Sequence, residues 1–206
     1  NACVCILVHG LPAYREAGSE TILSTLAHTP FDLLVAHDQD SAGMPVSGRA
    51  QYYALPAIPP PSERAARFLL KFQVLDAALR KTTHDFLLLI DADTVFVRRT
   101  TGGDILRALG DRRLGMIEQT TVTGSAMNRE SFRQHYIHHT LRVLDPDGIP
   151  PAPDQFRYFN SGVVLGHRSE LRALTDWALA TIPSRKTHAI GEHMIADQDY
   201  FQYWAL

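Results

Sequence analysis

The chain has 206 residues, 45% of them hydrophobic, so it can bury a core of its own without disulfides or a structural metal. Its 20 Lys and Arg residues against 22 Asp and Glu residues give a net charge of -2, without a long block of like charge. This balance argues against a nucleic-acid partner bound through its phosphates. The longest apolar stretches are far shorter than the ~20 residues that cross a bilayer. We therefore expect no transmembrane segment in this chain.

The two cysteines, Cys3 and Cys5, lie two residues apart in a β-prone run. Their side chains would point to one face of a strand, where a bond between them would be strained. We expect both to be reduced and buried, which favours a cytoplasmic protein. The chain opens with Asn1 rather than Met, so an anchor or signal ahead of it stays open, and we expect a C-terminal segment to be missing.

The first forty residues predict a β-α-β unit: a strand over 3–8, a helix over 19–28 and a strand over 31–37. Such a unit places a ligand crevice at the carboxyl end of its first strand. We expect His9, Gly10 and Tyr14 to line that crevice and to contact a nucleotide.

A proline-rich stretch over 55–61 precedes a predicted helix over 63–80. Three basic residues, Arg64, Arg67 and Lys71, lie along one edge of its apolar stripe. Lys71 in particular could contact phosphates, and a solvated helix edge is the alternative for all three.

The run 86–90 is continuously apolar, which is typical of a strand buried on both faces of a parallel sheet. Asp91 and Asp93 follow it, and a strand is expected to resume over 94–97. Two carboxylates at a strand exit suit Mg²⁺ or Mn²⁺, with water and substrate phosphates as further ligands. A simple turn is the alternative, because Asp is common in turns.

The second half predicts strands over 114–118 and 158–165, a helix over 129–143 and a last helix over 169–182 that stops at Pro183. The polar stretch 120–155 reads as an insertion on the acceptor side. His135, His138 and His139 are spaced for one helix face, and we interpret them as solvated because no carboxylate or cysteine accompanies them. The fold class is α/β, with a mostly parallel central sheet flanked by helices.

Three motifs in this order resemble those of nucleotide-sugar glycosyltransferases with the Rossmann-like GT-A fold: Asp91-Ala-Asp93, the segment 158–166 with Asn160-Ser161-Gly162, and Asp197-Gln198-Asp199. The third resembles the retaining branch, which includes glycogenin, lipooligosaccharide galactosyltransferases and blood-group-type transferases. The resemblance implies one GT-A domain over 1–206, with a nucleotide-binding half over 1–100 and a donor-sugar and acceptor half over 101–206.

The resemblance also implies roles for these residues. Asp93 would be the principal ligand of Mn²⁺ or Mg²⁺, and Asp91 a ligand that also reaches the ribose. Asn160, with Ser161 and Gly162 beside it, would contact the donor sugar, and so would Asp197. The family often adds a histidine ligand from a C-terminal segment that this chain lacks. The donor would be a nucleotide-diphosphate sugar, and the acceptor a saccharide, a lipid-linked molecule or a small molecule.

Gln198 would face the anomeric carbon, where an amide is a poor nucleophile, whereas a double displacement needs a carboxylate. We therefore favour a front-face reaction with retention of configuration, in which the acceptor hydroxyl attacks from the leaving-group side. Asp199 stays a possible nucleophile. An inverting enzyme would instead use Glu192, Asp197 or Asp199 as base.

Three alternatives of other classes remain. A haloacid-dehalogenase-type phosphatase would use Asp91 as its nucleophile, but that residue usually ends the first strand of such a domain. A nucleotidyltransferase would need a glycine-rich loop, which is missing from 9–17. The third is a sugar- or nucleotide-binding module without catalysis.

Overall fold

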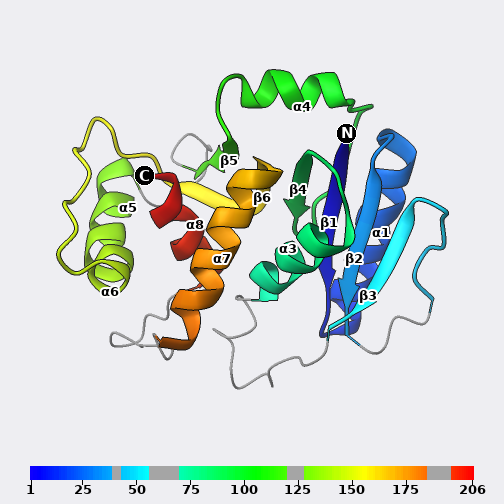
Figure 1. Ribbon diagram of the computed structural model, residues 1–206, viewed down its shortest axis with the longest axis horizontal. Coiled ribbons are helices and arrows are strands. Elements are labelled where there is room, and N and C mark those ends of the chain that lie inside the picture. The colour runs from blue at the N-terminus through cyan, green and yellow to red at the C-terminus, as the bar shows by residue number, and fades with distance from the viewer. Residues whose placement is uncertain (39–42, 56–69, 120–127, 185–195) are drawn as a thin grey trace.

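The computed structural model describes residues 1–38, 43–55, 70–119, 128–184 and 196–206. Within them, six strands form one sheet with helices on both faces (Figure 1). The strands are β1 (Ala2–Val8), β2 (Asp32–His37), β3 (Ala50–Ala54), β4 (Phe86–Ile90), β5 (Leu114–Glu118) and β6 (Phe159–His167). The helices are α1 (Pro12–His28), α3 (Leu70–Lys81), α4 (Gly102–Leu109), α5 (Arg129–His135), the π-helical segment η2 (Tyr136–Leu141), α6 (Arg142–Leu144), α7 (Arg168–Ser184) and α8 (Asp197–Ala205).

The strand order is β3-β2-β1-β4-β6-β5. The first four of these strands run parallel, and β6 is antiparallel to both β4 and β5. This confirms the expected α/β class with a mostly parallel sheet flanked by helices, an arrangement compatible with a Rossmann-like domain.

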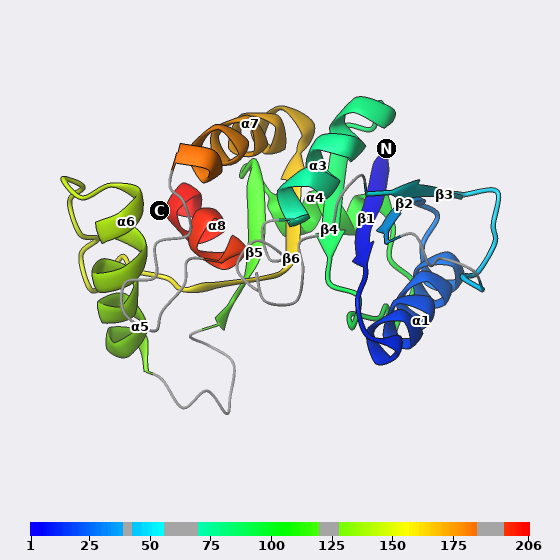
Figure 2. The ribbon, with the colours of Figure 1, turned by 90° about the horizontal axis from the view of Figure 1, so that it is seen from below.

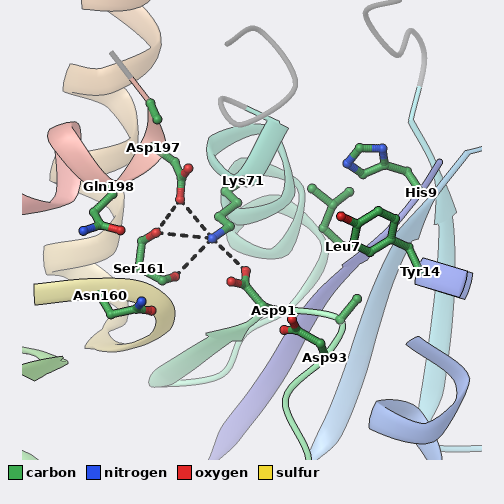
Figure 3. Close-up of a pocket in the computed structure, with 12 residues that line it drawn as sticks. Leu7, His9, Tyr14, Lys71, Asp91, Asp93, Asn160, Ser161, Asp197 and Gln198 are labelled. Atoms are coloured by element: carbon green, nitrogen blue, oxygen red, sulfur yellow. Dashed lines mark hydrogen bonds and ion pairs between the residues drawn. The ribbon is translucent and has the colours of Figure 1, made fainter. Parts of the chain in front are cut away.

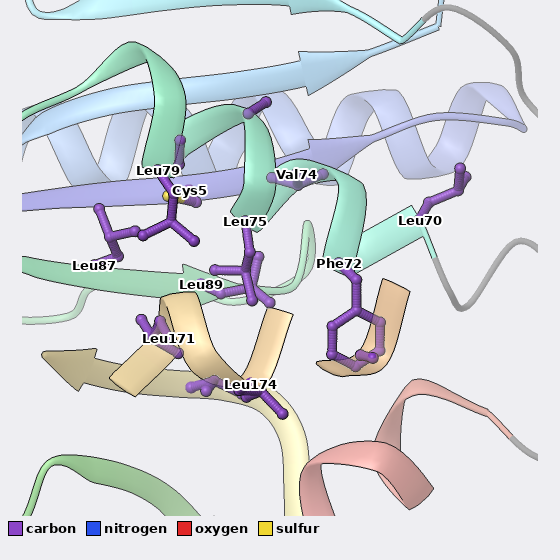
Figure 4. Packing of buried hydrophobic residues seen from close by; sticks show 14 of the residues in the cluster. Cys5, Leu70, Phe72, Val74, Leu75, Leu79, Leu87, Leu89, Leu171 and Leu174 are labelled. Carbon is purple, nitrogen blue, oxygen red and sulfur yellow. The ribbon is translucent and has the colours of Figure 1, made fainter. Parts of the chain in front are cut away.

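The centre of the sheet is buried on both faces, as the unbroken apolar run of β4 predicts. Leu87 and Leu89 pack under α3 and α7 (Figure 4). Leu88 and Ile90 pack on the opposite face with α1 and α4. Figure 2 shows α3 and α7 on one side of the sheet and α1 on the other. Each fully buried leucine or isoleucine contributes about 2 kcal/mol to folding, so the strand is held by both layers at once.

Helix α1 begins at Pro12, whereas the sequence predicted a start at Ser19. Proline suits the first turn of a helix, because the N–H that it lacks would have no partner there. Gly18 lies inside this helix. Glycine suits the position because a Cβ there would approach Val8 Cγ2 to 2.7 Å. The glycine therefore allows α1 to lie close to β1 and does not end the helix.

One expected strand is absent, two elements were not predicted, and one helix ends later than expected. Residues 94–97 are not a strand, because the N–H of Thr94 donates to Asp91 O and the chain turns away, which leaves Val97 84% exposed. The sequence analysis predicted neither β3 nor α4. Helix α4 begins with a capping box, in which Asp104 Oδ2 accepts from the N–H and the hydroxyl of Thr101, both at 2.7 Å. Helix α7 ends at Ser184, two residues after the predicted end at 182, which is the usual size of a difference at a helix boundary.

The other predicted elements are confirmed. The helix expected over 129–143 comprises α5, η2 and α6, and Figures 1 and 2 place it at the end of the molecule opposite to α1 and β3. Cys3 and Cys5 are buried free thiols. In the described part of the chain, no helix combines the length and apolarity needed to span a bilayer. Of the helix expected over 63–80, residues 63–69 lie outside the described ranges, and with them Arg64 and Arg67.

Candidate functional site

A cavity of about 500 Å³ opens at the carboxyl ends of β1 and β4, a size typical of ligand pockets. The chain adds β2 and β3 on one side of β1, and returns through α3 to place β4 on the other side. This reversal is the topological switch point at which open α/β sheets bind ligands. The residues predicted from sequence that line the cavity are His9, Tyr14, Lys71, Asp91, Asp93, Asn160, Ser161, Asp197 and Gln198 (Figure 3).

The backbone of the loop that carries Asp91 and Asp93 forms hydrogen bonds to two neighbouring elements, β6 and α1. The N–H of Asp91 donates to Gly162 O at 2.9 Å, and the hydroxyl of Thr21 on α1 donates to Ala92 O at 2.6 Å. These contacts fix the direction in which the two carboxylates leave β4. Their hard oxygen atoms suit a divalent cation such as Mg²⁺ or Mn²⁺.

A bulge in β6 brings Ser161 and Gly162 to the site. Asn160 pairs with Ile117 and Val164 with the adjacent Met116, so residues 161–163 bulge away from β5. A Cβ at 162 would lie 2.7 Å from Asn160 Oδ1 and 3.1 Å from Asp91 Oδ2, so a larger residue would displace these two side chains. Gly162 does not line the cavity itself, and its N–H donates to Asn160 Oδ1 at 2.6 Å.

Lys71 lies at the centre of the polar contacts. Its Nζ is 2.7 Å from Asp91 Oδ1 and 2.9 Å from Asp197 Oδ2, and it donates to Ser161 O at 3.2 Å and to Ser161 Oγ at 3.4 Å. Burial by itself lowers the pKa of Lys71, but attraction to Asp197 and Asp91 outweighs it, so the pKa is raised. The side chain is therefore an ammonium at neutral pH.

The pKa of Asp91 is raised from its ordinary value. Burial is the largest cause and the neighbouring charges of Asp197 and Asp93 add to it, while Lys71 acts in the opposite direction. Of the described side chains that line the cavity, three are aspartates and one is a lysine. The site therefore carries an excess of negative charge that a bound cation would reduce.

Helix α8 supplies the far wall of the pocket. Asp197, with 5% of its side chain exposed, accepts from Ser161 Oγ at 2.5 Å and pairs with Lys71. Phe72 of α3 stacks on Phe201 of α8 with ring centroids 4.9 Å apart, so the helices that carry Lys71 and Asp197 are packed together.

Asp199 does not line the pocket. Its Oδ2 accepts from the N–H of Ala196 at 2.9 Å, and its Oδ1 accepts from the Thr140 hydroxyl on η2. Both oxygens thus bind groups at the start of α8 and on η2. This geometry argues against the predicted role of Asp199 as a nucleophile, because an attacking carboxylate must face the substrate.

The loop after β1 and the first turn of α1 contribute the opposite wall. His9 and Tyr14 lie on the side away from Gln198, and Tyr14 is 57% exposed (Figure 3). Gly10 is outside the lining. It adopts a φ of 92°, which favours glycine, and its N–H donates to Asp38 Oδ2 at 2.9 Å. Sequence reasoning missed Asp38, although its position directly after β2 was a signal.

Two polar residues near Gln198 were also missed. Gln198 Nε2 donates to Gln119 Oε1 at 3.5 Å. The pKa of Tyr158 is raised to about 12. Burial is the largest cause and the charge of Asp199 adds to it, while a hydrogen bond with Gln198 acts in the opposite direction. Tyr158 begins the predicted segment 158–166 but was given no role there, and Gln119 directly follows β5 without a local pattern that marks it.

The three histidines do not form a metal centre. The rings of His135 and His139 lie 4.6 Å apart, and His138 is exposed. Across the described ranges, no group of three or more His, Cys, Asp or Glu side chains is placed to hold a metal ion. The metal role of the pair Asp91 and Asp93 stays a prediction, and Glu192 lies outside the described residues.

No protein-family model matches the sequence, and a search of curated proteins finds no match either.

Proposed function

We propose that the protein is a metal-dependent glycosyltransferase that moves a sugar from a nucleotide-diphosphate sugar to an acceptor hydroxyl with retention of configuration. The observation that supports this most is that one pocket at the switch point collects residues of three separate motifs. Asp91 and Asp93 come from the loop after β4, Asn160 and Ser161 from β6, and Asp197 and Gln198 from α8. The GT-A family assignment rests on these motifs.

The charge of the pocket favours a metal-bound rather than a free nucleotide diphosphate. A polyanion that enters alone meets three aspartates and gains one ammonium. Asp91 and Asp93 would hold Mn²⁺ or Mg²⁺, with phosphate oxygens completing the ligand shell. When bound, the cation supplies electrostatic stabilisation of the leaving diphosphate.

The chain's own residues would orient the donor. His9 and Tyr14 offer a surface for the base and ribose at the β1 end of the pocket. At the other end, Asp197 and Asn160 offer oxygen acceptors for sugar hydroxyls. The distance between these two walls is set by the sheet, so a bound donor would place its diphosphate near Asp91 and Asp93 in the middle.

The reaction at the anomeric carbon would follow the front-face course. The acceptor hydroxyl attacks from the leaving-group side as the bond from the anomeric carbon to the diphosphate breaks, and the departing diphosphate takes the hydroxyl proton. Gln198 would support the positive charge that develops on the sugar. Asp197 is a poor candidate nucleophile, because Lys71 and Ser161 hold its buried carboxylate.

A thermal-shift panel of uridine and guanosine diphosphates and their sugars, with Mn²⁺ or with chelator, tests the proposal. A ligand at about a hundredfold its Kd contributes roughly 2.7 kcal/mol, which for a chain of this size corresponds to a Tm rise of roughly 5–10 °C. We expect that rise with Mn²⁺ only. The proposal fails if none of these ligands raises Tm with metal present.

One observation favours the phosphatase alternative. The ammonium of Lys71 lies 2.7 Å from Asp91 Oδ1, a contact that would also keep a nucleophilic carboxylate ionised. Asp91 ends the fourth strand of the chain, however, and not the first. Incubation with phosphate esters separates the two functions, since a phosphatase releases phosphate from them whether or not a nucleotide sugar is present.

A further inference from the structure

The Lys71 ammonium lies among oxygen atoms in the way that a bound cation would. It is carried by α3, is 12% exposed, and has four oxygen atoms of Asp91, Asp197 and Ser161 within 3.4 Å (Figure 3). One of these atoms belongs to Asp91, a residue that the proposed function assigns to the metal. The same carboxylate therefore has two candidate positive partners.

We propose that Lys71 competes with the divalent cation for Asp91 in the nucleotide-free protein and so makes metal binding depend on the nucleotide diphosphate. This inference rests on the proposed function. Asp91 at 2.7 Å from an ammonium has part of its charge neutralised. A second cation placed on the same carboxylate is repelled by that ammonium, so the metal alone binds weakly.

A nucleotide diphosphate would relieve this competition. Its phosphate oxygens give the ammonium new partners and give the metal additional ligands. Lysine carries its charge on a flexible stem, so Nζ can leave Asp91 while α3 stays in place. Asp197 and Ser161 lie on the other side of Nζ and keep three of its four contacts during the shift.

The competing interpretation is a permanent ion pair that only stabilises the fold. The two differ in what removal of the ammonium does to metal affinity. A purely structural lysine, once replaced, lowers stability and changes the metal affinity by the same factor with and without nucleotide. A competing lysine, once replaced by a neutral side chain of similar length, leaves Asp91 free to bind the cation.

The test measures Mn²⁺ binding to the full chain by calorimetry and by the electron paramagnetic resonance signal of free Mn²⁺, without nucleotide and then with uridine or guanosine diphosphate. We expect Lys71→Met to bind Mn²⁺ alone at least tenfold more tightly than the unchanged protein. We expect the nucleotide to improve Mn²⁺ affinity at least tenfold less in this variant, because the competition is already gone. Lys71→Arg keeps the charge and should bind Mn²⁺ as weakly as the unchanged protein.

Lys81→Met is the matched control. It removes a lysine from the same helix, but Lys81 lies 4.9 Å from the Tyr53 ring centroid and outside the pocket. Its Mn²⁺ affinity should equal that of the unchanged protein. If Lys71→Met is unfolded in metal-free buffer, circular dichroism follows its refolding by Mn²⁺, and a failure of Mn²⁺ to restore structure overturns the inference.

Equal Mn²⁺ affinity in folded Lys71→Met and in the unchanged protein also overturns the inference. The proposed function is judged separately by whether the unchanged protein binds the nucleoside diphosphate more tightly with Mn²⁺ than with chelator. If it does so while Lys71→Met shows no gain, only the competition is wrong. If neither ligand binds either protein, both proposals fail.

Discussion

At the scale of single residues, the pocket depends on carboxylates and amides at fixed positions. Asp91 Oδ1 forms an ion pair with Lys71, and Gly162 leaves room for the second carboxylate oxygen of Asp91, Oδ2. Asp93 lines the same pocket two residues further along the chain. Changes to such groups should therefore alter binding and catalysis more than they alter folding.

Asp93→Ala should abolish the metal dependence of nucleotide binding together with transfer activity, because one of the two oxygen-donating side chains is lost. Calorimetry with uridine or guanosine diphosphate should then give equal Kd values in Mn²⁺ and in chelator. Asp111→Ala removes an exposed aspartate after α4 and should keep the dependence. If Asp93→Ala still binds nucleotide more tightly with Mn²⁺, the two-carboxylate metal site is wrong.

Gln198→Ala should lower kcat more than donor affinity, because an interaction made mainly in the charged transition state contributes little to ground-state binding. Steady-state kinetics with direct measurement of donor Kd checks this difference between kcat and donor affinity, with Gln134→Ala on the exposed side of α5 as control.

Proton NMR of the product of the unchanged protein should show an α-linkage from an α-linked donor. A β-anomeric coupling would make the enzyme inverting and would require a carboxylate base.

At the scale of elements, the site depends on how α8 is anchored. Phe201 packs on Phe72 of α3, and Gln202 binds the backbone at the start of β6: its Oε1 accepts from the N–H of Phe159 at 2.7 Å. Asp199 adds contacts to Ala196 and to Thr140 on η2. A π-helical segment is often found at functional sites, and here it presents a buried hydroxyl to the helix that carries Asp197 and Gln198.

Asp199→Ala should therefore act on stability before catalysis. The loss of a carboxylate that caps the helix start lowers the free energy of unfolding by about 1–2 kcal/mol. Urea unfolding measures this loss, and Thr140→Val should give a smaller loss of about 1 kcal/mol. Both variants should retain transfer activity within roughly a hundredfold, the cost of a small misplacement of reacting groups. Complete loss of activity in a stably folded Asp199→Ala would restore this residue as a nucleophile.

At the scale of the whole molecule, the sheet divides the pocket into a nucleotide end at β1 and a sugar end at α8. A crystal soaked with uridine or guanosine diphosphate and Mn²⁺ should show the base beside His9 and Tyr14, since these residues follow β1 at the switch point. Electron density for the base against α8 would reverse the proposed orientation of the donor.

Stability of the whole molecule should fall at high pH. Burial is the main cause that raises the pKa of both Tyr136 and Tyr158 to about 12. The unfolded state loses these protons near pH 10 and the folded state keeps them, so the free energy of unfolding decreases between about pH 10 and 12. Each tyrosine contributes at most about 1.4 kcal/mol per pH unit. Urea unfolding at several pH values should give a shallower decrease for Tyr158→Phe, and an unchanged slope would contradict the assigned pKa.

Local patterns were sufficient for much of the architecture and for the composition of the site. Apolar runs predicted β1, β2, β4, β5 and β6, and the run is continuous in β1 and β4, which are buried on both faces. The position of Asp91 after such a run identified it as a candidate site residue, whereas Asn160 and Asp197 were identified by the resemblance to glycosyltransferase motifs. Elements with weaker local signals, such as β3 and the first turns of α1, were missed because packing against neighbouring elements determines them.

The sequence by itself determined the α/β class, the strands that carry the candidate site and the chemistry of its side chains, because these follow from local periodicity and residue type. Only the tertiary structure decided that Lys71 joins Asp91 to Asp197, that Asp199 turns away to Thr140, and that Gly162 gives Asp91 its space. Those facts depend on segments up to 126 residues apart in the chain (Lys71 to Asp197). Their approach is set by the crossover of α3 and the bulge of β6, which no local pattern encodes.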